Sequence, residues 1–149
     1  MTGTVIAILA LALCTICCGI GSAIGLFKAG SAAAGAIADD EKKFSKVFVI
    51  AVLPATQGLY GFVITIIGLG SVSMGMEVSQ GLAVLGATLP MTVVGMISAI
   101  LQGLTSVSAI MSIAKNDNAG AKMMLFPAMV ETYAILSLVI TIMLLGTIG

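Results

Sequence analysis

Long apolar stretches make up most of the chain, and short groups of charged residues separate them. Two groups of charges lie at 39–46 and 115–122, and the isolated Glu77 stands between them. A helix needs about 20 consecutive apolar residues to cross a hydrocarbon layer of about 30 Å. The four apolar segments, each long enough to do so, are residues 3–38, 47–76, 78–114 and 123–149. The pattern therefore predicts an all-α protein with four transmembrane helices in two hairpins.

The two predicted hairpins resemble each other in sequence. Gly-Ile-Gly-Ser-Ala-Ile at 19–24 is similar to Gly-Met-Ile-Ser-Ala-Ile at 95–100. A Pro-Ala-x-x-x-x-Tyr pattern begins at Pro54 and again at Pro127. Such self-similarity indicates an internal duplication, and both copies run in the same direction. We expect a first hairpin at 1–75 and a second at 76–149, which together form a single four-helix unit.

Composition supports a membrane protein and excludes several other classes. Hydrophobic residues are 60% of the chain, charged residues are 8%, and mean hydropathy is +1.24. A water-soluble domain carries about 25% charged residues. The chain has no basic face for nucleic acid, and it lacks the histidines typical of transition-metal enzymes. We therefore expect a lipid bilayer around the chain and no nucleic-acid partner.

The lysines predict the orientation in the membrane. Each lies in or near the first or third connection, and none lies in the 74–77 turn or at a terminus. The positive-inside rule places both charged loops in the cytoplasm and both termini outside. No lysine precedes Lys28, so we expect no cleavable signal peptide. The protein is predicted to be a multi-pass protein of the cell membrane.

Glu131 is the acid that lies well inside an apolar segment. It is about 13 Å along the helix from Lys122. An ionisable group at that depth is expensive and marks a functional site. Isolation there favours a neutral carboxyl, whereas a bound cation keeps it ionised. The first hairpin has Gly58 at the equivalent position, so we expect one acid to serve four helices.

The second predicted helix offers groups that could share this site. Leu53, Thr56, Gln57 and Tyr60 have the spacing of one helix face. Thr56 and Gln57 provide side-chain oxygens, and Tyr60 provides a hydroxyl. Pro54 lacks an N–H and is expected to disturb the helix and free a carbonyl, a typical sodium ligand at membrane depth. The alternative is that these groups only hydrogen-bond neighbouring helices.

Gln102 adds a third helix to the predicted site. We expect Pro90 to open that helix as a first-turn proline, which places Gln102 about 18 Å from its outer end. Counted from their own outer ends, Gln57 and Glu131 lie at about 20 and 21 Å. The three side chains would then share one depth. In the alternative, the apolar residues 81–89 extend the third helix.

This set of groups predicts a site for a monovalent cation. A carboxylate with several neutral oxygens suits a hard cation, and a single acid favours a single charge. Sodium is the preferred ion because a site for protons alone would not need the amides and hydroxyls. The alternative is a protonated Glu131 that the same groups hydrogen-bond.

Other features of the first helix have structural interpretations. Its glycines are expected to allow close helix packing, and its Gly-x-Gly lacks the preceding strand of a dinucleotide site. Cys14, Cys17 and Cys18 are expected to act as small hydrophobic residues. Lys28 is expected to point away from the ion site and to reach towards a headgroup.

Two motifs identify a family resemblance that extends over essentially the whole chain. They are Leu-Pro-Ala-Thr-Gln-Gly-Leu-Tyr-Gly at 53–61 and Pro-Ala-Met-Val-Glu-Thr-Tyr-Ala at 127–134. With the double hairpin, they closely resemble the proteolipid K (c) subunit of V-type rotary ATPases, especially sodium-transporting bacterial members. The resemblance implies a rotor ring of many copies, a membrane stator subunit and a central stalk. The Na⁺ ligands that it implies are Glu131, Gln102, Gln57, Thr56 and the Leu53 carbonyl, with Tyr60 hydrogen-bonded to the acid.

The resemblance also implies a mechanism in which this chain is not the catalyst. Na⁺ from a stator half-channel neutralises Glu131, the loaded site crosses the lipid-facing part of the circle, and ATP hydrolysis in other subunits turns the ring. The closest alternative is the same rotor carrying H⁺. A small multidrug exporter is disfavoured because the chain has only two Tyr, five Phe and no Trp. A purely structural proteolipid would not need Glu131.

Overall fold

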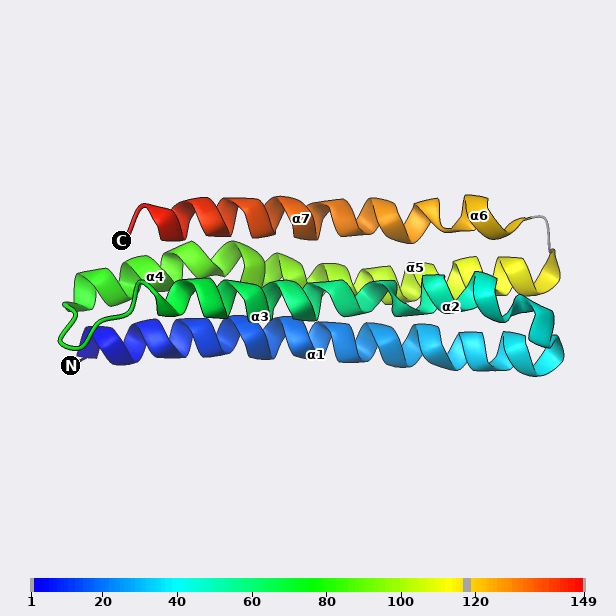
Figure 1. Ribbon diagram of the computed structural model, residues 1–149, viewed down its shortest axis with the longest axis horizontal. Coiled ribbons are helices and arrows are strands. Elements are labelled where there is room, and N and C mark those ends of the chain that lie inside the picture. Colours follow the sequence, from blue (N-terminus) through cyan, green and yellow to red (C-terminus); the bar gives the residue numbers. More distant parts are fainter. Residues whose placement is uncertain (1, 117–118, 149) are drawn as a thin grey trace.

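Four long apolar helices lie side by side in the computed structural model, which describes residues 2–116 and 119–148 without the side chain of residue 121 (Figure 1). The N- and C-termini lie at the same end of the bundle (Figure 1). We call the opposite end, with the connections around 39–46 and 115–122, the charged end. The predicted fold class, all-α with four membrane-length helices in two hairpins, is confirmed for the described residues.

The first two spans form the first hairpin. The first span is one helix, α1 (Thr2–Asp39), and the second begins with the 3₁₀ turn η1 (Glu41–Lys43). It continues as α2 (Phe44–Val52), the 3₁₀ turn η2 (Leu53–Ala55) and α3 (Thr56–Leu69). Pro54 lies in η2 and has no N–H for the helical ladder. The expected disturbance of this helix is therefore a short, tighter turn.

The third span corrects one prediction. It consists of α4 (Val78–Pro90), the π-helical turn η3 (Met91–Gly95) and α5 (Met96–Lys115). The prediction that Pro90 opens the helix is wrong, because a reciprocal capping box between Glu77 and Gln80 starts it at Val78. A wider π turn directly follows the proline and keeps the span continuous. The alternative, extension through residues 81–89, is correct, so Gln102 lies about 36 Å from the beginning of this span.

The fourth span is shorter than the others. The single turn α6 (Gly120–Met123) leads through Met124 into α7 (Leu125–Gly146). In Figure 1, α7 lies along the side of the bundle opposite α1. The acid Glu131 is thus in the second turn of a helix whose other described residues are uncharged.

Small residues let α1 pack closely against α5. A Cβ on Gly103 would collide with the backbone of Gly25, and a Cβ on Gly21 would lie 2.5 Å from the Met96 carbonyl oxygen. The predicted crowded interface is therefore present at Gly21 and Gly25. The same helix has open space beside three other glycines, at 19, 30 and 35. The glycines of α1 thus differ in role, and those on the face that meets α5 are the ones that allow close packing there.

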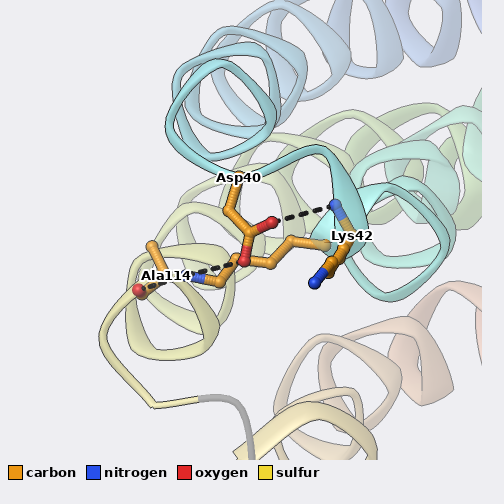
Figure 2. A network of polar contacts seen from close by, with 4 residues as sticks. Asp40, Lys42 and Ala114 are labelled. Atoms are coloured by element: carbon orange, nitrogen blue, oxygen red, sulfur yellow. Dashed lines mark hydrogen bonds and ion pairs between the residues drawn. The ribbon is translucent and has the colours of Figure 1, made fainter.

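A lysine connects the two hairpins at the charged end. Lys43 Nζ donates to the Ala114 carbonyl oxygen at 2.8 Å and lies 4.0 Å from Asp40 Oδ2 (Figure 2). Asp40 Oδ1 accepts the Lys42 backbone N–H at 3.1 Å and caps η1 (Figure 2). Cations are favourable near the last carbonyls of a helix. This contact holds the first connection against the C-terminal end of α5.

Lys28 lies on the exposed surface of α1, close to the level at which α7 begins. Gly25 packs against the turn of α5 that carries Gln102, and Gln102 in turn donates to the Pro127 carbonyl. Lys28 is one turn from Gly25 towards the charged end, and Leu125, the first residue of α7, lies in the same direction from Pro127. The backbone of Lys28 therefore lies nearer the charged end than the polar layer described below.

Candidate ion-binding site

A layer of buried polar side chains divides the interior of the bundle. One apolar cluster, which includes Leu11 and Ile64, lies towards the termini, and another, which includes Ile50 and Ile110, lies towards the charged end. Gln57 and Gln102 lie between the two clusters and have 0% of their surface exposed. Buried amides need hydrogen-bond partners. The contacts of these two glutamines therefore define the layer.

Glu131 joins the layer from α7 and is half-buried. Its Oε1 accepts a hydrogen bond from the Tyr60 hydroxyl at 2.9 Å, and its Oε2 accepts one from Gln102 Nε2 at 3.3 Å. Both carboxylate oxygens thus accept from neutral donors on two other spans. Each oxygen of the carboxyl group therefore has a hydrogen-bond partner on another span.

Gln102 is held in orientation by three contacts. In addition to Glu131, its Nε2 donates to the Pro127 carbonyl oxygen at 3.1 Å. Its Oε1 accepts from Gln57 Nε2 at 2.6 Å. Gln102 therefore connects the second span to the fourth through a single side chain.

The turn at Pro54 gathers oxygens on the other side of Gln57. The Leu53 carbonyl oxygen accepts from the Thr56 hydroxyl at 3.0 Å and also from the Thr56 backbone N–H. The same hydroxyl lies 3.3 Å from Gln57 Oε1. One carbonyl, one hydroxyl and one amide oxygen thus lie within a single turn, adjacent to the Gln57–Gln102 pair.

The structure brings all the sequence-predicted residues into one continuous hydrogen-bonded layer. Those residues are Leu53, Thr56, Gln57, Tyr60, Gln102 and Glu131. Within the described part of the chain, Glu131 is the acidic member of this layer, and the other members contribute neutral oxygens and donors. One negative charge among neutral oxygens is suited to a small monovalent cation. Their roles as ion ligands stay a prediction.

Sequence reasoning missed one residue that bonds to the helical turn carrying Thr56 and Gln57. The Ser22 hydroxyl oxygen on α1 accepts the Gly58 backbone N–H at 2.7 Å. Ser22 is 5% exposed. The internal repeat contained a signal, because a serine stands at the same position of both copies, Ser22 and Ser98.

The fold and the layer define a class: a duplicated four-helix membrane protein with one carboxylate among buried amides. Comparison with known proteins makes the assignment specific. The sequence model of the family described as the C subunit of ATP synthase matches the chain twice, at residues 9–68 and 85–144. The chain therefore belongs to this ATP synthase family, and the predicted tandem duplication is confirmed.

Two characterised relatives are similar over most of the chain. The V-type sodium ATPase subunit K of Enterococcus hirae is 44% identical over 142 residues, which are 95% of this chain and 91% of the relative. The A-type ATP synthase subunit K of Methanocaldococcus jannaschii is 40% identical over 124 residues, 83% of this chain and 56% of the relative. The resemblance to the K subunit of V-type ATPases is thus confirmed at the level of the family.

Proposed function

We propose that this chain is the rotor-ring subunit of a V-type ATPase and that it carries Na⁺ across the membrane at Glu131. Family membership and the sodium ATPase relative support the rotor and the ion. The observation that carries the site is the contact of Glu131 with Gln102 and Tyr60, at 3.3 and 2.9 Å. The protein itself is a non-catalytic part of the machine, and other subunits hydrolyse ATP.

The proposed Na⁺ ligands are oxygens that already lie in the polar layer. They belong to Glu131, Gln102, Gln57, Thr56 and the Leu53 carbonyl, and Tyr60 holds the carboxylate from outside this set. Oxygen ligands suit hard cations. The carboxylate supplies the one negative charge, so a site that holds Na⁺ is electrically neutral.

Neutrality is what allows the loaded site to move through lipid. A charged side chain in the middle of the hydrocarbon costs about 2.5 kcal/mol or more, and Na⁺ on Glu131 removes that charge. Rotation driven by ATP hydrolysis carries the neutral site past the lipid. A cation on the stator subunit then favours the ionised carboxylate and helps to release Na⁺.

The partners follow from this mechanism. Copies of the chain form a homo-oligomeric ring in the bilayer, which turns against a membrane stator subunit and is attached to a central-stalk subunit. Each copy contributes two hairpins, 1–75 and 76–149, and one site. The lysine-rich charged end faces the cytoplasm and both termini face outside, as the positive-inside rule requires.

The same rotor carrying H⁺ is the second candidate. The side chains of the layer hydrogen-bond one another, and a protonated Glu131 would fit the same neighbours. ATP-driven uptake of radioactive sodium into inverted vesicles that contain the whole ATPase distinguishes the Na⁺ rotor from the H⁺ rotor. Uptake that continues when a protonophore collapses the proton gradient supports Na⁺. Proton uptake that needs no sodium overturns the sodium proposal and leaves the H⁺ rotor.

A further inference from the structure

We propose that Ser22 is a positioning residue for the ion site and that it sets the Na⁺ affinity of the site without touching the ion. The inference rests on the proposed function and extends it to α1, a helix that contributes no predicted ligand. Its structural basis is the 2.7 Å hydrogen bond from the Gly58 N–H to the Ser22 hydroxyl oxygen.

The Gly58 N–H has a hydrogen-bond acceptor on a neighbouring helix. Gly58 is the third residue of α3, which begins at Thr56 after the 3₁₀ turn at Pro54. The 3₁₀ turn interrupts the regular hydrogen-bond ladder of this span directly before Thr56. Ser22 supplies the Gly58 N–H with an acceptor from a neighbouring helix. It fixes the first turn of α3, and that turn carries Thr56 and Gln57.

Close packing of α1 against both α3 and α5 holds the Ser22 contact in place. A Cβ on Gly58 would lie 3.1 Å from the Ser22 hydroxyl oxygen, so α1 and α3 approach closely here. One turn further along α1, Gly25 packs against the backbone of Gly103, beside Gln102. Since α1 is held against both helices, it determines how Gln57 and Gln102 face each other across their 2.6 Å contact.

The internal repeat shows that this contact belongs to one hairpin. Ser98 is the equivalent of Ser22 and has the same 5% exposure. Its hydroxyl donates at 3.3 Å to the Gly95 carbonyl of its own span. Ser22 bridges two helices and Ser98 does not, so the two serines form a matched pair in which the first alone has the bridging contact.

Loss of the Ser22 oxygen is expected to weaken Na⁺ binding through geometry. The Gly58 N–H would lose its cross-helix acceptor, which favours movement of the first turn of α3. Thr56 and Gln57 would then move relative to Gln102, whereas Glu131 would keep its own contacts with Tyr60 and Gln102. Ion affinity should therefore fall, and carbodiimide reactivity of Glu131 without sodium should not change.

The experiment measures the Na⁺ concentration that half-protects Glu131 from a carbodiimide, at fixed pH, in membranes containing the whole ATPase. For Ser22→Ala we expect that concentration to rise about fivefold, the effect of about one lost hydrogen bond. The labelling rate without Na⁺ should be unchanged in this variant, and a general loss of structure would change it.

The matched control is Ser98→Ala, expected to stay within about twofold of the native value because its hydroxyl bonds only to its own span. If Ser22→Ala does not assemble, Ser22→Cys provides the test, since its larger sulfur is a weaker acceptor that cannot approach the Gly58 N–H as closely. An unchanged half-protection concentration in the assembled Ser22 variant overturns the inference, as does an equal effect of Ser98→Ala. If the native protein shows no sodium protection at all, the proposed sodium function has failed instead.

Discussion

Gln57 Nε2 donates to Gln102 Oε1 at 2.6 Å, and this contact joins the first hairpin to the second. Neither hairpin holds the candidate site alone, because Thr56, Gln57 and Tyr60 come from one and Gln102 and Glu131 from the other. The candidate site thus needs both hairpins, although only the second has an acid at the equivalent position, Glu131 against Gly58.

The two glutamines should act as one unit. Gln57→Leu and Gln102→Leu each leave a buried amide without its partner, which costs about 1–3 kcal/mol, and each should raise the half-protecting Na⁺ concentration at least about fivefold. The double variant should be much less impaired than the product of the two effects, since contacting residues are not additive. A double-mutant cycle on sodium protection measures this coupling. Independent, multiplicative effects would show that the 2.6 Å contact has no part in binding.

Tyr60 and Tyr133 provide a second matched pair. Tyr60 donates to Glu131, whereas Tyr133, its equivalent in the repeat, has 67% of its surface exposed. A hydrogen bond to a charged group contributes about 1.5–3 kcal/mol, so Tyr60→Phe should weaken sodium protection about tenfold or more. Tyr133→Phe should leave it unchanged. The same change in both variants would contradict the assigned role of Tyr60.

The residues of the candidate site could be predicted from the sequence. The bounds of the helices that carry these residues could not all be predicted. The spacing of Leu53, Thr56, Gln57 and Tyr60 on one face could be read directly, because it follows from helical periodicity. The depth argument for Gln102 rested on Pro90 as a helix start, and that start was wrong. The glutamine still meets Gln57, because the third span extends beyond the second on the terminal side.

Some structural features could not be predicted from a single sequence. A proline in an apolar segment is compatible with a helix start, a 3₁₀ turn or a π turn, and the chain uses the last two after Val52 and Pro90. The choice depends on packing against neighbouring helices. The Ser22–Gly58 contact joins residues on different helices, and periodicity describes only one helix at a time.

Close packing between α1 and α5 predicts at which glycines a substitution by alanine lowers the stability of the protein. Gly103→Ala places a Cβ against the Gly25 backbone, which cannot move away as a side chain could. Overpacking of this kind costs about 1–3 kcal/mol, so the detergent-solubilised complex should dissociate at a lower temperature. Gly30→Ala is the control, because nothing lies within 4 Å of the position that its Cβ would take, and no loss is expected. Equal stability of the two variants would disprove the packing argument.

The proposed orientation predicts that the connections at the two ends of the bundle are labelled from opposite sides of the membrane. Lys42→Cys should react with a membrane-impermeant maleimide only in inverted vesicles, because the proposed orientation places the charged end in the cytoplasm. A cysteine at Ser73 should react only in right-side-out vesicles. The native Cys14 and Cys18 have 0% exposure and should stay unlabelled, and the half-buried Cys17 is replaced in all variants by Cys17→Ala. The reverse pattern would invert the proposed topology.

The most direct test of the central claim is carbodiimide labelling of Glu131 with and without Na⁺ at fixed pH. A carbodiimide modifies the protonated carboxyl, so bound Na⁺ should prevent the reaction. The account predicts that millimolar Na⁺ protects the native protein and that Glu131→Gln is neither labelled nor able to support coupled transport. Protection that depends on pH alone would contradict the sodium site, and coupled transport by Glu131→Gln would contradict the carrier role of Glu131.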